Sequence, residues 1–196
     1  MQARNVRALK LKLAVMLLGD GWSGRDRIGY TSKDPALLSY FNNLVKSLIG
    51  KEAKIIPGDR AFRAVVYSKS FVKELLKLSP TFRTKKLSNG LFPPAKIPDE
   101  VFTLPKKEIV EILRLIFSME GGVTIYARKS KNNQFTVEKK VFLSSANPIL
   151  VQQYTQLINL ILKDVKMKYD NKGRNLYIKD KKGIEEFYKK LDFYLK

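Results

Sequence analysis

Two nine-residue stretches, LAVMLLGDG at residues 13–21 and LRLIFSMEG at residues 113–121, carry most of the information in this 196-residue sequence. Each is a run of mainly apolar residues with a helical pattern, and each ends in an acid followed by glycine. The two acids, Asp20 and Glu120, lie 100 positions apart. A carboxylate is poorly placed at the C-terminal end of a helix, because the helix macrodipole is already negative there. If the two helix ends meet, the acids form a paired-carboxylate site that needs a cation.

The composition narrows the class of protein. The net charge of +20 is spread evenly, with +11 on residues 1–100 and +9 on residues 101–196. Such a surplus indicates nucleic acid lying along the whole molecule, and solubility charge on a lysine-rich protein is the alternative. The chain has no Cys and no His, which leaves oxygen ligands for any metal and favours Mg²⁺. We recognise no signal peptide or membrane anchor, so we expect an intracellular protein.

The order of predicted elements repeats along the chain. We expect helices over residues 5–19, 35–49, 70–78, 105–120, 148–161 and 181–194, and strand pairs over residues 22–33, 54–67, 123–144 and 166–178. Asp34 and Asn147, each followed by proline, are equivalent N-caps. The predicted fold class is α+β, a mixed α/β chain of two pseudo-symmetric αββαββα repeats, residues 1–79 and 105–196. A proline-rich linker at residues 80–104 joins them.

The sequence resembles a known protein family. The two stretches resemble the paired signature of the LAGLIDADG homing endonucleases, in their single-chain, two-motif form. The residues that match the signature are Leu13, Ala14, Asp20, Gly21, Leu113 and Gly121, with Glu120 as the second acid. The doubled motif, with the same strand and helix order after each copy, makes the resemblance specific over nearly the whole chain.

The resemblance implies a fold and an activity. Two antiparallel sheets would form a saddle over double-stranded DNA, with the motif helices packed along the pseudo-dyad and their acids at the minor groove. The implied function is that of a monomeric, intron-encoded endonuclease that hydrolyses one phosphodiester bond in each strand of a long, asymmetric target. The implied cofactor is Mg²⁺ or Mn²⁺, and Ca²⁺ is expected to bind without supporting cleavage. Neither a membrane nor an obligatory protein partner is implied.

The metal site is expected at the two acids. Asp20 and Glu120 are the predicted catalytic and metal-binding residues, with Gly19 and Met119 in the same metal site. A divalent ion held by carboxylates lowers the pKa of a bound water and offsets the charge of a phosphate. Without an ion, two carboxylates at close quarters repel each other.

Basic residues are expected beside the acids. Lys33, just before Asp34, matches a position at which the family carries a basic catalytic residue. The corresponding segment of the second repeat, residues 143–146, has no lysine. The candidates to replace it are Lys129, Lys131 and Lys140.

The predicted strands supply the DNA-binding candidates. Arg and Gln can read base edges, whereas Lys more often meets phosphate, and only one face of each sheet can face DNA. The candidates in the first repeat are Arg25, Arg27, Tyr30, Lys54, Arg60, Arg63 and Tyr67. Those in the second are Tyr126, Arg128, Lys129, Gln134, Lys139, Lys140, Lys166, Lys168, Arg174 and Tyr177. Trp22 is expected to be a packing anchor.

Two other functions fit the same sequence. A maturase on this fold would bind its own intron RNA and assist splicing. A non-cleaving, sequence-specific DNA-binding protein would keep the fold without cutting. The intact acid pair favours a nuclease over the non-cleaving protein, but it does not distinguish a nuclease from a maturase.

Overall fold

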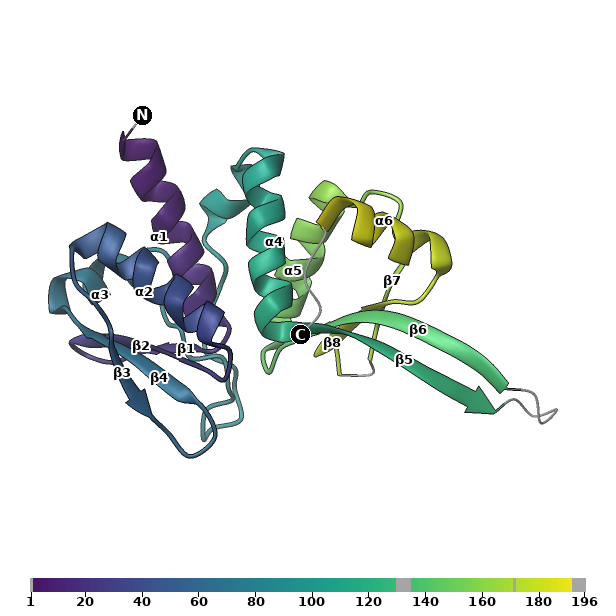
Figure 1. Cartoon of the computed structure of the whole chain (residues 1–196), viewed down its shortest axis with the longest axis horizontal. Coiled ribbons are helices and arrows are strands. Elements are labelled where there is room, and N and C mark those ends of the chain that lie inside the picture. The colour runs from purple at the N-terminus through teal and green to yellow at the C-terminus, as the bar shows by residue number, and fades with distance from the viewer. Residues whose placement is uncertain (1, 130–134, 171, 192–196) are drawn as a thin grey trace. The chain divides into compact units, whose positions relative to one another are not determined.

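The structure, a computed structural model, describes residues 2–129, 135–170 and 172–191 (Figure 1). The chain divides into two compact units, Met1–Leu104 and Pro105–Lys196. Within the described residues there are two four-stranded antiparallel sheets and six α-helices, which confirms the predicted α+β class. None of the helices described is both long enough and apolar enough to cross a membrane.

The first unit contains one sheet and three α-helices. Its elements are α1 (Gln2–Leu18), β1 (Gly21–Ser23), β2 (Arg27–Ser32), α2 (Pro35–Ile49), β3 (Lys54–Pro57), β4 (Phe62–Tyr67) and α3 (Lys69–Leu75). The strand order is β1-β2-β4-β3. Helix α2 begins where the sequence predicts, because the Asp34 carboxylate accepts a hydrogen bond from the Ala36 N–H at 2.9 Å. It ends at Gly50, whose φ of 67° suits glycine.

The core of the first unit lies between the helices and one face of this sheet. Residues 13–18 of α1 are all buried, as expected for a helix that is apolar all round. Side chains at alternate positions of β2 point to the same core, and the Tyr30 ring stacks on Phe41 of α2 with the ring centroids 5.4 Å apart. We call the face of each sheet that points away from its helices the open face.

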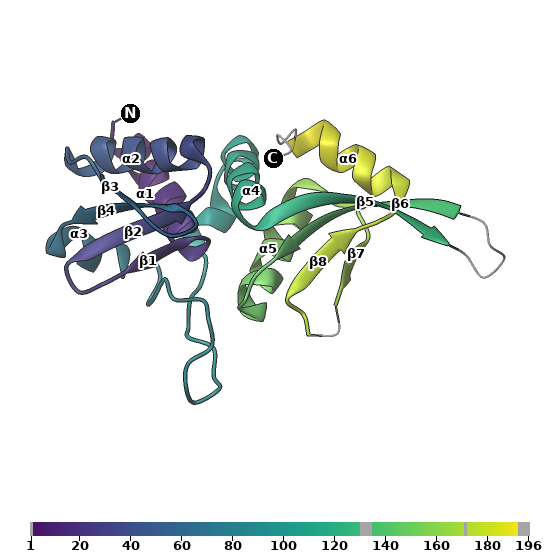
Figure 2. The same ribbon diagram turned by 60° about the horizontal axis from the view of Figure 1, so that its bottom comes forward.

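The segment from residue 76 to residue 104 folds against the first unit, and part of it forms a long loop (Figure 2). Phe82 and Ile97 are each only 1% exposed. A 3-10 helix at Asp99–Thr103, which the sequence analysis did not predict, precedes the second unit. Residues 80–104 are therefore proline-rich, as predicted for a linker, but their apolar side chains anchor them to the first unit.

The second unit repeats the architecture of the first. Its elements are α4 (Lys106–Glu120), β5 (Gly121–Lys129), β6 (Phe135–Ser144), α5 (Pro148–Ile161), β7 (Met167–Tyr169), β8 (Asn175–Ile178) and α6 (Lys181–Leu191). The strand order β5-β6-β8-β7 matches that of the first sheet. Asn147 caps α5 as Asp34 caps α2, with its Oδ1 accepting from the Ile149 N–H at 3.0 Å. The element order therefore confirms the predicted αββαββα repeat, and the packing of the motif helices along a pseudo-dyad stays a prediction.

Candidate active site and nucleic-acid interface

Asp20 lies at the junction between α1 and β1, and its side chain is exposed. The chain turns from helix to strand at Gly21, where a Cβ atom would lie 3.0 Å from the Leu17 carbonyl oxygen and closer still to the Leu17 Cα. This close approach explains the glycine that follows the acid. The Asp20 carbonyl accepts a hydrogen bond from the Thr31 N–H at 3.1 Å, so the end of β2 lies beside the acid.

Glu120 occupies the equivalent position in the second unit. It is the last residue of α4, and a Cβ atom on the following Gly121 would lie 2.9 Å from the Phe117 carbonyl oxygen. Ser144, at the end of β6, donates from its hydroxyl to the Glu120 carbonyl at 3.5 Å. Each acid therefore lies at the foot of its motif helix, beside the end of the second strand of its own sheet. The pairing of the two acids across the units, and the metal site with Gly19 and Met119, stay predictions.

Lys33, the basic residue predicted beside Asp20, has an alanine at the equivalent position of the second unit. Lys33 is exposed and lies between two residues joined by a hydrogen bond, in which the Asp34 N–H donates to the Ser32 hydroxyl at 3.1 Å. In the second unit the Asn147 N–H donates to the Ser145 hydroxyl at 3.3 Å in the same way. Ala146 therefore stands at the position of Lys33.

Of the two described lysines proposed to replace it, Lys140 is the nearer to the acid along the sheet, since its strand partner Thr124 is four residues from Glu120. It lies on the open face of the second sheet, where its ammonium is 5.6 Å from the Tyr126 ring centroid and 5.9 Å from that of Tyr177. Lys129 is nine residues along β5 from the acid, which corresponds to about 30 Å of extended strand. Lys131 lies outside the described residues.

Strand register separates the DNA-binding candidates of the first unit. Arg27 is paired with Tyr67 across β2 and β4, and its guanidinium donates to the Tyr67 hydroxyl at 3.2 Å. The candidates on the open face are Arg27, Lys54, Arg63 and Tyr67. Arg25 and Arg60 are exposed in the turns that follow β1 and β3.

Tyr30 does not belong to this surface, contrary to the sequence prediction. It lies opposite Ala64 on the helix-covered face, and both residues are 0% exposed. DNA cannot reach a side chain in this position. Strand alternation places Tyr30 and Arg27 on opposite faces, because they are three residues apart.

Register also divides the candidates of the second unit. Tyr126, Lys140, Lys168 and Tyr177 lie on the open face. Lys139 shares the other face with the buried Val141 and Leu143 of β6. Lys129 of β5 lies on that same face, because it is paired with Phe135, so neither lysine belongs to the open face. Of the remaining candidates, Lys166 and Arg174 are exposed in loops. Arg128 lies within β5, and Gln134 lies outside the described residues.

The open face of the second sheet also holds a lysine that the sequence analysis did not select. Lys179 follows β8, with its ammonium 5.2 Å from the Tyr177 ring centroid and 3.9 Å from the Glu138 carboxylate. The Tyr126 hydroxyl donates to the same carboxylate at 2.5 Å. Such contacts hold cationic and aromatic side chains in place on a surface where either kind can meet nucleic acid.

Each open face carries an aromatic ring packed on a glycine. Trp22 is paired with Gly29 across β1 and β2, and a Cβ atom on Gly29 would lie 2.8 Å from the indole Nε1 and closer to two ring carbons. In the second sheet, Phe142 is paired with Gly122, where a Cβ atom would lie 2.8 Å from the Phe142 Cζ. The contact agrees with the expected packing role of Trp22.

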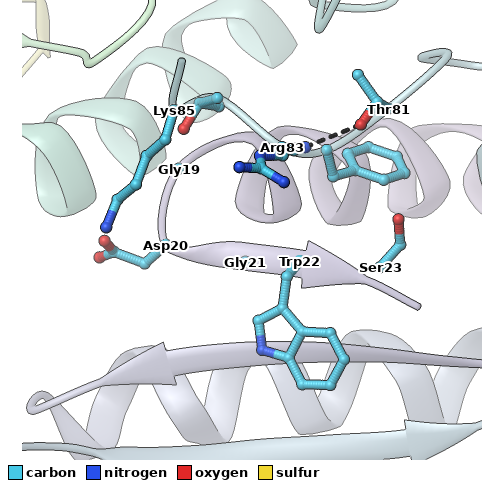
Figure 3. Close-up of a pocket in the computed structure, with 10 residues that line it drawn as sticks. Gly19, Asp20, Gly21, Trp22, Ser23, Thr81, Arg83 and Lys85 are labelled. Atoms are coloured by element: carbon cyan, nitrogen blue, oxygen red, sulfur yellow. Dashed lines mark hydrogen bonds between the residues drawn. The ribbon is translucent and has the colours of Figure 1, made fainter. Parts of the chain in front are cut away.

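A pocket of about 480 Å³ lies beside Asp20 (Figure 3). Residues 19–23 line one side of it and residues 81–85 of the connecting segment line the other. The Lys85 ammonium points toward the Asp20 carboxylate (Figure 3). Arg83 and Lys85 lie in the segment predicted as a linker and were not among the candidate site residues, and the apolar Phe82 beside them was the only signal in the sequence for their position.

The donor atoms at the acids suit a hard divalent ion. Among the described residues, no three His, Cys, Asp or Glu side chains form a metal-binding group. An ion at Asp20 would therefore complete its coordination with water and phosphate oxygens. Mg²⁺ is commonly bound in this way, through one or two carboxylates plus substrate phosphates.

Comparison with known proteins identifies the fold. The sequence matches no protein-family model and no curated protein. Among solved structures, one of mesophilic variants from the homing endonuclease I-DmoI is 14% identical, with a TM-score of 0.58 over 98% of this chain and 99% of that chain. The chain has the LAGLIDADG homing endonuclease fold.

Two further structures share this homing endonuclease fold. I-SmaMI bound to an uncleaved DNA target in the presence of calcium ions is 13% identical, with a TM-score of 0.60 over 94% of this chain and 85% of that chain. The homing endonuclease I-WcaI, bound to its DNA recognition sequence, is 14% identical, with a TM-score of 0.55 over 97% and 83%. A fold can host several functions, so the function is argued from the site.

Proposed function

We propose that this chain is a site-specific, divalent-metal-dependent endonuclease that cuts both strands of a long double-stranded DNA target. The observation that carries the proposal is the repeated placement of an acid. Asp20 and Glu120 each lie where the buried motif helix of their unit meets the first strand of a sheet with a cationic open face. Structures of the same fold support it, since I-DmoI has been seen in complex with DNA and Mn.

In this proposal the acids hold the metal ion and the strands hold the DNA. Asp20 and Glu120 would bind a divalent ion, which when bound lowers the pKa of a water and offsets phosphate charge. Lys33, two residues beyond Thr31, whose N–H donates to the Asp20 carbonyl, would contact a phosphate at the same half-site. The second half-site has Ala146 at this position, so the two half-sites are chemically unequal.

The open faces would supply sequence recognition and affinity. Arg27 is held by Tyr67 through a hydrogen bond and by its position 5.6 Å from the ring centroid, which orients the guanidinium before DNA arrives. A guanidinium presented in this way can bond to O6 and N7 of guanine. Lys140, between two tyrosine rings, presents a point charge suited to phosphate.

The test is cleavage of a randomised duplex library in Mg²⁺ or Mn²⁺, with sequencing of the cut ends. We expect defined ends from the wild-type protein. Asp20→Asn and Glu120→Gln should abolish cutting but keep DNA binding in Ca²⁺, because each replaces a negatively charged carboxylate ligand with a neutral amide of nearly the same size. Binding without cutting by the wild-type protein would indicate a non-cleaving DNA-binding protein. Retained cleavage in both variants would refute the metal assignment, and selective binding of structured RNA in a parallel assay would favour the maturase.

A further inference from the structure

The second sheet extends beyond the part that its helices cover. Strand β8 pairs with β6 only over Val141–Ser144, so residues 135–140 of β6 are paired with β5 alone. The two strands project past β8 and α6 as a ribbon (Figures 1 and 2). The first sheet has no such extension, because β2 pairs with β4 along its whole length. We call the two-stranded extension, residues 125–129 and 135–139, the arm.

One face of the arm is apolar and exposed. Ile125, Val137 and Phe135 continue the face of the sheet on which Val141 and Leu143 are buried. The exposed fractions of these three side chains are 63%, 66% and 72%. Single exposed apolar residues are common on proteins, whereas a contiguous apolar patch marks an interaction site.

The opposite face of the arm is polar. It carries Tyr126 and Glu138, which are joined by the hydrogen bond from the hydroxyl to the carboxylate, and it continues at Lys140 into the open face of the sheet. The apolar face of the arm therefore points away from the surface proposed to meet DNA. Its apolar side chains are left for a different partner.

A groove of about 350 Å³ lies between the arm and the beginning of α6. Two aliphatic side chains, three lysines and one acid line it: Val137, Ile184, Lys139, Lys179, Lys181 and Glu185. Three positive charges and one negative charge leave the groove with a net charge of +2. Lys179 also contacts the Tyr177 ring, so it lies at the edge where the two faces of the sheet meet.

We propose that the apolar face of the arm and this groove form a docking site for an acidic, amphipathic segment of another protein. The apolar side chains of the segment pack on Ile125, Val137 and Ile184. Its carboxylates pair with Lys139 and Lys181. Recognition of this kind, in which apolar anchors fill a groove and charges at its rim select the partner, is common for peptide segments. The proposal does not depend on the nuclease function.

The chemistry of the surface favours this occupant over nucleic acid and over a second copy of the chain. Single-stranded nucleic acid binds by stacking its bases on flat rings, whereas Ile125, Val137 and Ile184 are aliphatic and only Phe135 among these apolar residues has a ring. Phosphates would meet the lysines but would leave the aliphatic side chains in water. A second copy would bring an identical cationic groove, on a chain of net charge +20, against the first.

The experiment selects peptides from a displayed library of random sequence on the full chain, with counter-selection on the double variant Ile125→Thr/Val137→Thr. Threonine keeps the β-branched shape that suits a strand, so the variant should fold, which circular dichroism checks. We expect the enriched peptides to combine Asp or Glu with apolar residues. The affinity of a fluorescently labelled enriched peptide is then measured by anisotropy.

Two kinds of substitution in the site should weaken the peptide differently. Ile125→Thr/Val137→Thr should lower its affinity by a factor of about 10², since each anchor residue of an interface is worth about tenfold or more. Lys139→Gln/Lys181→Gln should lower it by a factor of about 10 at low salt and by less at high salt, because exposed ion pairs are screened.

Matched controls lie elsewhere on the chain. Ile55→Thr changes an aliphatic residue that is 47% exposed in β3 of the first sheet, and Lys163→Gln changes an exposed lysine that follows α5. Both should bind the peptide as the wild type does. Equal effects of the controls and the arm variants would overturn the proposal, because they would indicate general hydrophobicity or charge.

Three other results would also overturn it. The first is that no peptide is enriched over the counter-selection. The second is that Ile125→Thr/Val137→Thr weakens the binding of a random-sequence RNA more than that of the peptide, since the face would then bind nucleic acid. The third is a dimer in sedimentation velocity that the same variant abolishes, which would assign the face to a second copy. A wild-type protein that cuts no DNA refutes the nuclease proposal and leaves this one standing.

Discussion

Gly29→Ala would test the contact between the Trp22 ring and β2. The added methyl group would lie 2.8 Å from the indole Nε1 and nearer to two ring carbons, well inside van der Waals contact. The indole is rigid and strand β4 holds β2 from the other side, so the strain is hard to relieve. Overpacking of this kind costs about 1–3 kcal/mol. For a chain of this length each kcal/mol corresponds to about 2–4 °C in Tm.

The assay is thermal and urea denaturation followed by circular dichroism and by the fluorescence of Trp22, the only tryptophan of the sequence. Trp22→Ala provides the control background, because the methyl group at Gly29 then has room, and its unfolding is followed by circular dichroism alone since no tryptophan remains. In that background, Gly29→Ala should be neutral or stabilise by up to about 1 kcal/mol, since alanine loses less backbone entropy in a strand than glycine. Equal destabilisation with and without the indole would refute the reasoning.

The duplicated fold allows two further predictions. Asp34→Ala and Asn147→Ala should each lower the free energy of unfolding by about 1 kcal/mol through loss of an N-cap, measured by urea denaturation. A change well below 0.5 kcal/mol in both would contradict the capping role. Ala146→Lys should narrow the difference between the two strand-cutting rates, because it adds to the second half-site the ammonium that Lys33 supplies to the first. Unchanged rates on both strands would show that this position does not act on the phosphate.

Features that depend on residues close together in the sequence, such as helix caps and helix ends, were predicted well. The helix starts at Asp34 and Asn147 depend on one side chain bonding to a backbone N–H two residues away, and both are confirmed. The acids followed by glycine were predicted to mark helix ends, and the structure adds that the turn into the strand leaves no room for a Cβ atom at Gly21 or Gly121. The start of α1 was placed too late, at residue 5 instead of Gln2.

Features that depend on distant pairing were predicted less well. Tyr30 and Tyr67 have similar surroundings in sequence, but one is in the core and the other is 52% exposed on the open face. Their sidedness is fixed by the pairing of β2 with β4, which are separated by a helix and another strand. The position of Lys85 likewise depends on the burial of Phe82 against the first unit, for which a proline-rich segment gives little signal in sequence.

The aromatic–glycine pairs limit which strands can be exchanged between the two repeats. In the first sheet the large ring is on the first strand and the glycine on the second, whereas in the second sheet the order is reversed. Replacing β1 with β5 alone would put two glycines opposite each other, and replacing β5 with β1 would put an indole against a phenyl ring. Shuffling or grafting between the repeats should therefore succeed only when both strands of a hairpin move together, which makes the hairpin the smallest interchangeable part of the sheet.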